Sequence, residues 1–172
     1  MNLSLNYWNL LVLNKGENMK KILVSYFSAT GVTKEIAEKL ASKLNGVLFE
    51  IEPKEKYTSK DLNWMDKESR SSIEMSQNIK PEIVSKVANL EEYDTLLLGF
   101  PIWWYKEPTI IDKFLEENDM NGKRIYVFVT SGSSSIDSTY KSIKNNFSEL
   151  NFVDGKRFTG DESEEEYLSW IK

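Results

Sequence analysis

Residues 27–37 read Phe27-Ser28-Ala29-Thr30-Gly31-Val32-Thr33-Lys34-Glu35-Ile36-Ala37. They follow a short β-branched and aromatic run at 22–26, which predicts a buried strand. A hydroxyl-rich turn with one glycine comes next, and a helical pattern starts directly after it. The first turn of a helix has backbone N–H groups without intrahelical partners, and the helix dipole favours an anion there. The stretch therefore predicts a strand, a phosphate-binding loop and a helix in direct succession.

The loop over 28–33 suits a single phosphate monoester that is held by uncharged donors. It offers three hydroxyl groups, and its glycine lets the backbone approach a ligand closely. It contains no lysine or arginine, and it matches neither the Gly-Lys-Ser/Thr end of a Walker loop nor a Gly-x-Gly-x-x-Gly turn. An ordinary strand, turn and helix with a Ser/Thr cap remains the alternative for this loop alone. The candidate phosphate-binding residues are Ser28, Ala29, Thr30, Gly31, Val32 and Thr33.

Composition limits the chemistry that the chain itself can perform. The 172 residues suffice for one domain with a substantial core, and 40% of them are hydrophobic and 28% charged. No apolar stretch approaches the roughly 20 residues that cross a bilayer. The absence of cysteine and histidine excludes disulfides, thiol nucleophiles, imidazole bases and the usual zinc or haem ligands. Any redox chemistry must therefore come from a bound organic cofactor, and we expect neither a catalytic side chain nor a metal site.

The charge and the N-terminus give further expectations. A net charge of −5 argues against nonspecific nucleic-acid binding; it suits a basic protein partner or simply solubility. We expect a cytoplasmic monomer or homodimer with no membrane or nucleic-acid partner. Residues 1–18 lack the early positive cluster and the cleavage site of a signal peptide, whereas Met19 begins a typical α/β pattern. We expect translation to start at Met19, so that 1–18 is a mis-assigned extension and 19–172 is the domain.

Strand and helix patterns alternate along the chain. Strands are predicted at 22–27, 47–51, 95–100, 124–129 and 156–158, and helices at 33–45, 81–90, 109–117, 137–150 and 164–171, with Gly46 as the C-terminal cap of the first helix. The segment 57–78 is polar and predicted to be irregular or partly helical. Strands separated by helices imply right-handed crossovers. The fold class is therefore α/β, a three-layer doubly wound sandwich with a five-stranded parallel sheet.

Two further loops leave the same edge of the predicted sheet, where ligands of open α/β sheets bind. After the third strand come Pro101, Ile102, Trp103, Trp104 and Tyr105. Adjacent aromatic side chains in a loop could stack on a flat ring, or Trp103 and Trp104 could plug the sheet edge against the next helix. After the fourth strand the residues are small and hydroxylated, which keeps the backbone near a ligand: they are Thr130, Ser131, Gly132 and Ser133.

The hexamer Ser28-Ala29-Thr30-Gly31-Val32-Thr33 resembles the phosphate loop of flavodoxins. The Gly-x-Pro-Ile-Trp-Trp and Thr-Ser-Gly loops are similar to those of one flavodoxin-like branch. The resemblance implies the strand order 2-1-3-4-5 of the short-chain form and FMN as cofactor. It places 28–33 on the phosphate, 101–105 along the flavin ring and 130–133 at its far edge. The chain departs from typical flavodoxins in having no glycine between Pro101 and Tyr105, where a peptide flip stabilises the half-reduced flavin.

Three functions follow as hypotheses. The first is an electron carrier between redox partner proteins, in which FMN carries the chemistry. The second is an NAD(P)H-dependent FMN oxidoreductase acting on quinones or similar acceptors, with Tyr57 or Tyr105 orienting substrate. The third is a sensor or scaffold that keeps the fold without the flavin.

Two polar segments have two interpretations each. The segment 56–78 could shape a substrate pocket or form a salt-bridged flap, and the flap is the simpler interpretation. The acidic run 161–166 is explained as the first turn of the last helix, with partner docking as the alternative.

Overall fold

The computed structural model describes residues 21–84 and 86–171. Its centre is a five-stranded parallel sheet of order β2-β1-β3-β4-β5, which confirms the predicted fold class and strand order. The strands are β1 (Lys21–Tyr26), β2 (Val47–Glu50), β3 (Tyr93–Pro101), β4 (Arg124–Thr130) and β5 (Phe152–Arg157). The predicted extension over 1–18 and its boundary at Met19 lie outside the described residues.

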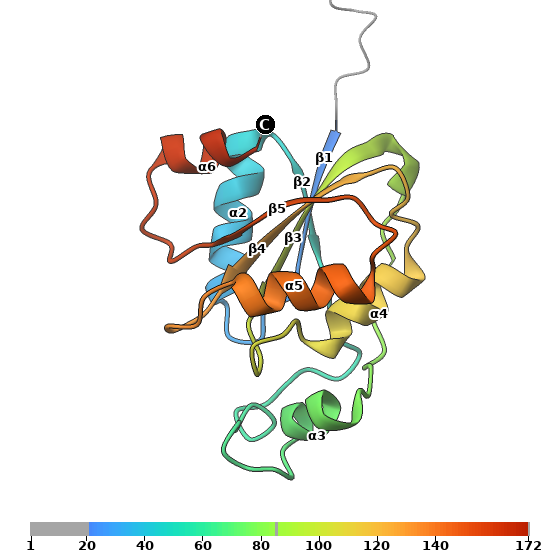
Figure 1. Ribbon diagram of the computed structural model, residues 1–172, viewed down its shortest axis with the longest axis vertical. Helices are drawn as coiled ribbons and strands as arrows, with labels where there is room; N and C mark the ends of the chain where they lie inside the picture. Colours follow the sequence, from blue (N-terminus) through green and yellow to red (C-terminus); the bar gives the residue numbers. More distant parts are fainter. Residues whose placement is uncertain (1–20, 85, 172) are drawn as a thin grey trace, which may run out of the picture.

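Helices cover both faces of this sheet (Figure 1). The helices are α2 (Val32–Leu44), α3 (Arg70–Gln77), α4 (Thr109–Glu117), α5 (Asp137–Asn146) and α6 (Glu164–Trp170), with a short 3-10 turn η1 (Leu90–Glu92). Helices α2 and α6 lie on one face, and α4 and α5 on the other. Helix α3 lies apart, beyond the edge at which the strands end.

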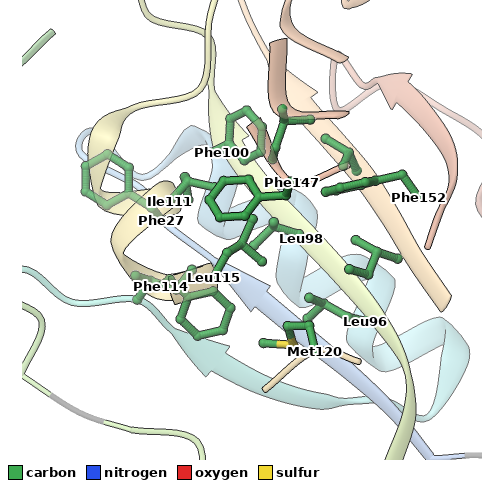
Figure 2. Packing of buried hydrophobic residues seen from close by; sticks show 14 of the residues in the cluster. Phe27, Leu96, Leu98, Phe100, Ile111, Phe114, Leu115, Met120, Phe147 and Phe152 are labelled. Carbon is green, nitrogen blue, oxygen red and sulfur yellow. The ribbon is translucent and has the colours of Figure 1, made fainter. Parts of the chain in front are cut away.

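Successive side chains of β3 point to opposite faces of the sheet, and each face has its own hydrophobic core. Leu96, Leu98 and Phe100 face α4 and α5, whereas Leu97 faces α2 and α6. All four side chains are fully buried, as expected of a central parallel strand that has helices on both sides. Figure 2 shows the first of these cores, in which side chains from β3 and α4 pack together with Phe147, the residue directly after α5. The sheet thereby holds its carboxyl edge, and every loop leaving that edge, on a rigid base.

Several predicted boundaries are shifted for local reasons. Helix α2 ends at Leu44, one residue before its predicted end, because Asn45 rather than Gly46 is the C-terminal cap and takes the left-handed conformation (φ 51°). Helix α5 stops at Asn146 instead of residue 150, and β5 starts at Phe152 instead of residue 156.

The predicted helix over 81–90 is wrong. Instead, Ile83 forms an isolated antiparallel bridge with Pro53, and η1 is the first helical turn among the described residues that follow. The backbone N–H of Lys54 donates to Glu82 (2.8 Å), and that of Val84 donates to Glu52 (2.9 Å). The segment is therefore held by backbone pairing with the chain that leaves β2, a long-range contact that local periodicity does not reveal, and Val84 stays 61% exposed.

The segment between β2 and the bridge at Ile83 contains one short helix. Ser69 caps α3 through its hydroxyl, which accepts the N–H of Ser72. Tyr57 anchors the segment to the sheet, since its ring packs edge-on against Phe27 (5.7 Å between centroids) and Trp103 (5.4 Å). Among the residues that the structure describes, no helix is both long and apolar enough to cross a membrane.

Candidate functional site

The three loops singled out in the sequence meet at one edge of the sheet. Tyr26 of β1 lies beside Gly99 of β3, and Pro101 of β3 lies beside Thr130 of β4. The ends of these strands are therefore neighbours, and the loops that follow them leave the sheet together. The structure thus brings the predicted site residues of all three loops to one place.

The phosphate loop joins β1 directly to α2. Gly31 stands at the helix N-cap with φ 95°, a conformation that residues with a side chain rarely adopt. It has no side chain, so no side-chain cap occupies the N–H groups of the first turn of α2. Ser28 instead accepts the N–H of Gly31 itself (3.1 Å), which folds the loop back on the strand. The helix N-terminus is thereby open to an external anion.

The two threonines of this loop have different surroundings. Thr33 is only 1% exposed, and its hydroxyl oxygen lies 2.8 Å from that of Thr130. Thr30 is exposed at the tip of the loop, and no hydrogen bond of its side chain is found within residues 21–84 and 86–171. Thr33 therefore fixes the loop to β4, and Thr30 is the hydroxyl free to meet a ligand.

Thr130 connects all three loops. Besides its contact with Thr33, its carbonyl oxygen accepts the N–H of Ile102 from the second loop (2.9 Å). The third loop follows it directly in the chain.

The second loop makes a tight turn at Trp104 and Tyr105. Trp103 and Lys106 exchange two backbone hydrogen bonds (3.0 and 2.9 Å) across the turn. Both central residues have positive φ, 47° at Trp104 and 63° at Tyr105, as in the hairpin turns that normally use Asn-Gly. Each bulky residue in this region costs about 1–2 kcal/mol. Backbone strain of this kind clusters at functional sites, and this strained turn leaves two aromatic rings exposed to solvent.

The adjacent tryptophans of this loop differ in role. Trp103 is half-buried and packs edge-on against Phe27 (5.6 Å between centroids) and Tyr57, and neither partner belongs to the next helix that the plug interpretation named. Trp104 is 41% exposed and Tyr105 67% exposed. Trp104 and Tyr105 are therefore the rings available for stacking on a flat ligand, while Trp103 supports them from behind.

The third loop is braced by a residue that sequence reasoning assigned no role. Arg157, at the end of β5, donates to the Ser131 hydroxyl (2.9 Å) and to the carbonyl oxygens of Ser131 (3.0 Å) and Gly132 (3.2 Å). The Ser131 hydroxyl in turn donates to the carbonyl oxygen of Ser134 (2.6 Å). Because the last strand was predicted to run through residue 158, Arg157 was placed inside it. The sequence does contain a signal for this role, because Arg157 is a cation near the end of the strand that neighbours the third loop.

A groove of about 750 Å³ opens beside the strained turn. Trp104 and Lys106 form one wall, and Trp64, Met65 and Met75 from the segment around α3 form the other. Its size falls within the usual range for small-molecule sites. The segment 56–78 thus contributes to a groove, as in the pocket interpretation, and it also contains an Arg70–Glu74 ion pair, as in the salt-bridged flap.

A buried pair of carboxyl groups lies directly behind the turn. Glu107 is 3% exposed and accepts from Asn146 (2.8 Å) and Ser142 (3.3 Å) of α5. Asp112 of α4 is also buried. Its burial, reinforced by the negative charges of Glu107 and Glu116 and opposed by Lys80, raises the pKa of Asp112 to about 7. Burial also raises the pKa of Glu107.

The donors of this edge fit a flavin nucleotide. A phosphate at this edge would meet an uncapped helix N-terminus, the Thr30 hydroxyl and a loop without a carboxylate. A flat ring could stack on Trp104 and Tyr105, and its polar edge would then face the braced small residues of 131–133. Within the described ranges, no group of three or more acidic, histidine or cysteine residues could hold a metal ion.

Comparison with known proteins gives the family. A family model described as Flavodoxin matches residues 21–172. The chain belongs to the flavodoxin family. A candidate flavoprotein from Bacteroides eggerthii DSM 20697 is 42% identical, with 88% of this chain and 95% of that chain covered and a TM-score of 0.85. A candidate flavoprotein from Bacteroides uniformis ATCC 8492 is 46% identical, with 88% and 97% covered and a TM-score of 0.82.

More distant relatives of this flavodoxin-family chain share the fold or a short segment. A Lactobacillus acidophilus NCFM flavoprotein, solved in complex with FMN, is 24% identical over 89% of this chain and 99% of that chain, with a TM-score of 0.72. An uncharacterized NAD(P)H oxidoreductase of Escherichia coli (strain K12), YcaK, is 33% identical over 48 residues. That match spans 28% of this chain and 24% of the E. coli protein.

The hydroxyl pair Thr33–Thr130 predicts energetic coupling between the two loops. Thr130→Val leaves the buried Thr33 hydroxyl without its partner, and we expect a loss of about 1–3 kcal/mol in the free energy of unfolding. Thr33→Val should behave similarly, and the double variant should lose less than the sum of the two by about 1 kcal/mol. Urea unfolding of the four proteins measures this cycle. Strictly additive losses would show that the two hydroxyls do not interact.

The buried Asp112 predicts an unusual pH dependence of stability. Its folded pKa of about 7 lies above the ordinary value of 3.8, so between these values the native state holds more protons than the unfolded chain. Its stabilising contribution is therefore complete below about pH 4 and is lost as pH rises through 7, at no more than about 1.4 kcal/mol per pH unit. Asp112→Asn should remove this decline in urea unfolding between pH 4.5 and 7.5 (roughly the titration window).

Asp161→Asn is the matched control, because Asp161 is exposed. It should retain the wild-type decline. If the free energy of unfolding falls equally steeply with pH in the wild type and in Asp112→Asn, the raised pKa of Asp112 would be contradicted.

Proposed function

We propose that this chain binds FMN and uses it to carry electrons between redox partners. The observation that carries the proposal is the convergence of an uncharged loop and an uncapped helix N-terminus with two exposed aromatic rings, tied together through Thr130. Membership of the flavodoxin family supports it, and so does a relative of the same fold that was solved with FMN. The chain has no cysteine or histidine, so the redox chemistry is assigned to the cofactor.

Each loop has a separate task in this proposal. The N–H groups of the first turn of α2 and the Thr30 hydroxyl bind the phosphate, while Ser28, Ala29, Gly31 and Val32 shape the loop and Thr33 fixes it. Trp104 and Tyr105 line the ring, with Pro101, Ile102 and Trp103 holding their turn in place. Backbone and hydroxyl groups of Ser131, Gly132 and Ser133 face its polar edge. Bound FMN supplies one- and two-electron transfer.

The surroundings of the ring set its redox properties. Apolar aromatic walls disfavour an anionic reduced ring, and the ring-lining stretch 101–105 contains no cation. We therefore expect a low reduction potential. The turn at Trp104 and Tyr105 has positive φ values without a glycine, in the loop where typical flavodoxins have one.

A second candidate, an NAD(P)H-dependent FMN oxidoreductase, is favoured by the groove beside Trp104. A pure carrier needs only an exposed flavin edge, whereas a groove of about 750 Å³ offers space for a small acceptor. The short match to the E. coli oxidoreductase agrees with this candidate. FMN-loaded protein mixed with NADPH without oxygen separates the two functions. Rapid bleaching of the flavin absorbance indicates the oxidoreductase, and an unchanged spectrum indicates the carrier.

Thr30→Ala tests the phosphate assignment. The variant should bind FMN about tenfold or more weakly, since a hydrogen bond to a charged group contributes roughly 1.5–3 kcal/mol. Riboflavin lacks the phosphate, so its affinity should stay unchanged, which makes it the internal control. Fluorescence titration of FMN and riboflavin with the wild type and with the variant gives the four dissociation constants. Equal losses for FMN and riboflavin would contradict the assignment.

A further inference from the structure

Large apolar side chains are unusually exposed around the groove beside Trp104. Trp64 is 70% exposed and Met65 76% exposed, and both line the groove together with Trp104 and Met75. Exposed tryptophan and methionine gathered around one concavity mark a binding site rather than ordinary surface. Met side chains also adapt to flat aromatic ligands through sulfur–ring contacts. The groove therefore suits a planar, apolar body.

The charges of this groove are all positive. Lys67 and Lys106 belong to its lining, and the lining residues include no aspartate or glutamate. Neither lysine forms an ion pair with another residue in the described ranges 21–84 and 86–171. The chain as a whole carries −5, and Asp66, Glu68 and Glu107 adjoin the two lysines in the sequence, but none of these three carboxylates lines the groove. It complements a ligand with a negatively charged substituent.

The wall formed by the segment around α3 is rigidly held. Glu74 accepts hydrogen bonds from Arg70 (2.7 Å) and from the Tyr57 hydroxyl. The Arg70 guanidinium lies 4.1 Å from the Tyr57 ring centroid, and Tyr57 packs on Trp103. A chain of contacts thus runs from α3 to the residue next to Trp104, so both walls of the groove share one support. A preformed site spends less binding free energy on ordering its walls.

We propose that this groove is the binding site for a planar aromatic anion, an aromatic carboxylate or sulfonate, held next to the flavin site. The ring lies against Trp64 and Trp104, and the anionic group faces Lys67 and Lys106. Trp104 belongs both to this groove and to the expected ring contacts of the flavin, which makes the bound anion a neighbour of the cofactor. Its role as a substrate rests on the oxidoreductase candidate above and requires a ring that accepts two electrons, such as a quinone that carries the anionic group, whereas its binding is tested separately.

Three naphthalene probes of the same isomer test the site: naphthalene sulfonate, naphthylmethanol and naphthylmethylammonium. They share the flat ring and differ in charge. Calorimetric titration into FMN-saturated protein should show the sulfonate binding tightest and the ammonium weakest. The sulfonate should also quench tryptophan fluorescence. Titration of FMN into the same preparation is recorded first, so that a failure of the FMN proposal is seen independently of the groove.

Two sets of variants assign the binding to this groove. Lys67→Met combined with Lys106→Met should weaken the sulfonate by about tenfold and leave naphthylmethanol unchanged, as expected for two partly exposed ion pairs. Trp64→Ala should weaken the sulfonate and naphthylmethanol alike. Lys141→Met on α5 and Leu168→Ala on α6, both exposed and outside the groove lining, are the matched controls and should bind as wild type does. Circular dichroism verifies that each variant is folded.

Other results would overturn the proposal. Equal affinity for the three probes would show that the groove does not select for a negative charge, which contradicts the roles of Lys67 and Lys106. Competition between FMN and the sulfonate would show that the groove is part of the flavin site itself. Absence of probe binding, together with a dimer in sedimentation that Trp64→Ala dissociates, would make the groove a contact between two copies of this chain.

Discussion

The hydroxyl contact between Thr33 and Thr130 is the interaction on which the candidate site depends. Parallel strands bring their carboxyl ends to one edge, but loops at such an edge are free to diverge. The contact is buried, and the Thr130 carbonyl oxygen also accepts the N–H of Ile102. One residue at the end of β4 therefore fixes the phosphate loop on one side and the aromatic loop on the other. Arg157 fixes the third loop from β5. The geometry of the site follows from these few polar contacts on a rigid sheet.

The aromatic turn shows how such support is used. Trp104 and Tyr105 take left-handed conformations that cost free energy, and their side chains remain exposed. The cost is tolerated because the reciprocal bonds between Trp103 and Lys106 and the packing of Trp103 on Phe27 hold the turn in place. The same turn forms one wall of the groove whose other wall is the segment around α3. A single strained element thus connects the expected flavin contacts with the cavity beside them.

Much of this arrangement could be predicted from the sequence. The apolar run at 95–100 and the hydroxyl loop after β1 are local signals, and they predict the central strand and the phosphate loop directly. The resemblance to flavodoxins added the strand order. Long-range contacts could not be predicted. The residues at 81–84 pair with the chain after β2, so the helical spacing of their apolar side chains wrongly predicted a helix. The two threonines, Thr30 and Thr33, differ in burial, and so do the two tryptophans, Trp103 and Trp104. Their separate roles follow from this difference, which the sequence does not reveal because the residue types are identical. Arg157 and the pairing of Glu107 with Asp112 likewise required the packed structure.

A titration of FMN with the cofactor-free protein tests the central claim most directly. Stacking on Trp104 and Tyr105 should quench the fluorescence of FMN until one equivalent of protein has been added, and inorganic phosphate should compete because both ligands use the N-terminus of α2. Riboflavin should bind more weakly, because it lacks the group that this loop is shaped to hold. FMN that keeps its free fluorescence in the presence of excess folded protein would contradict the account.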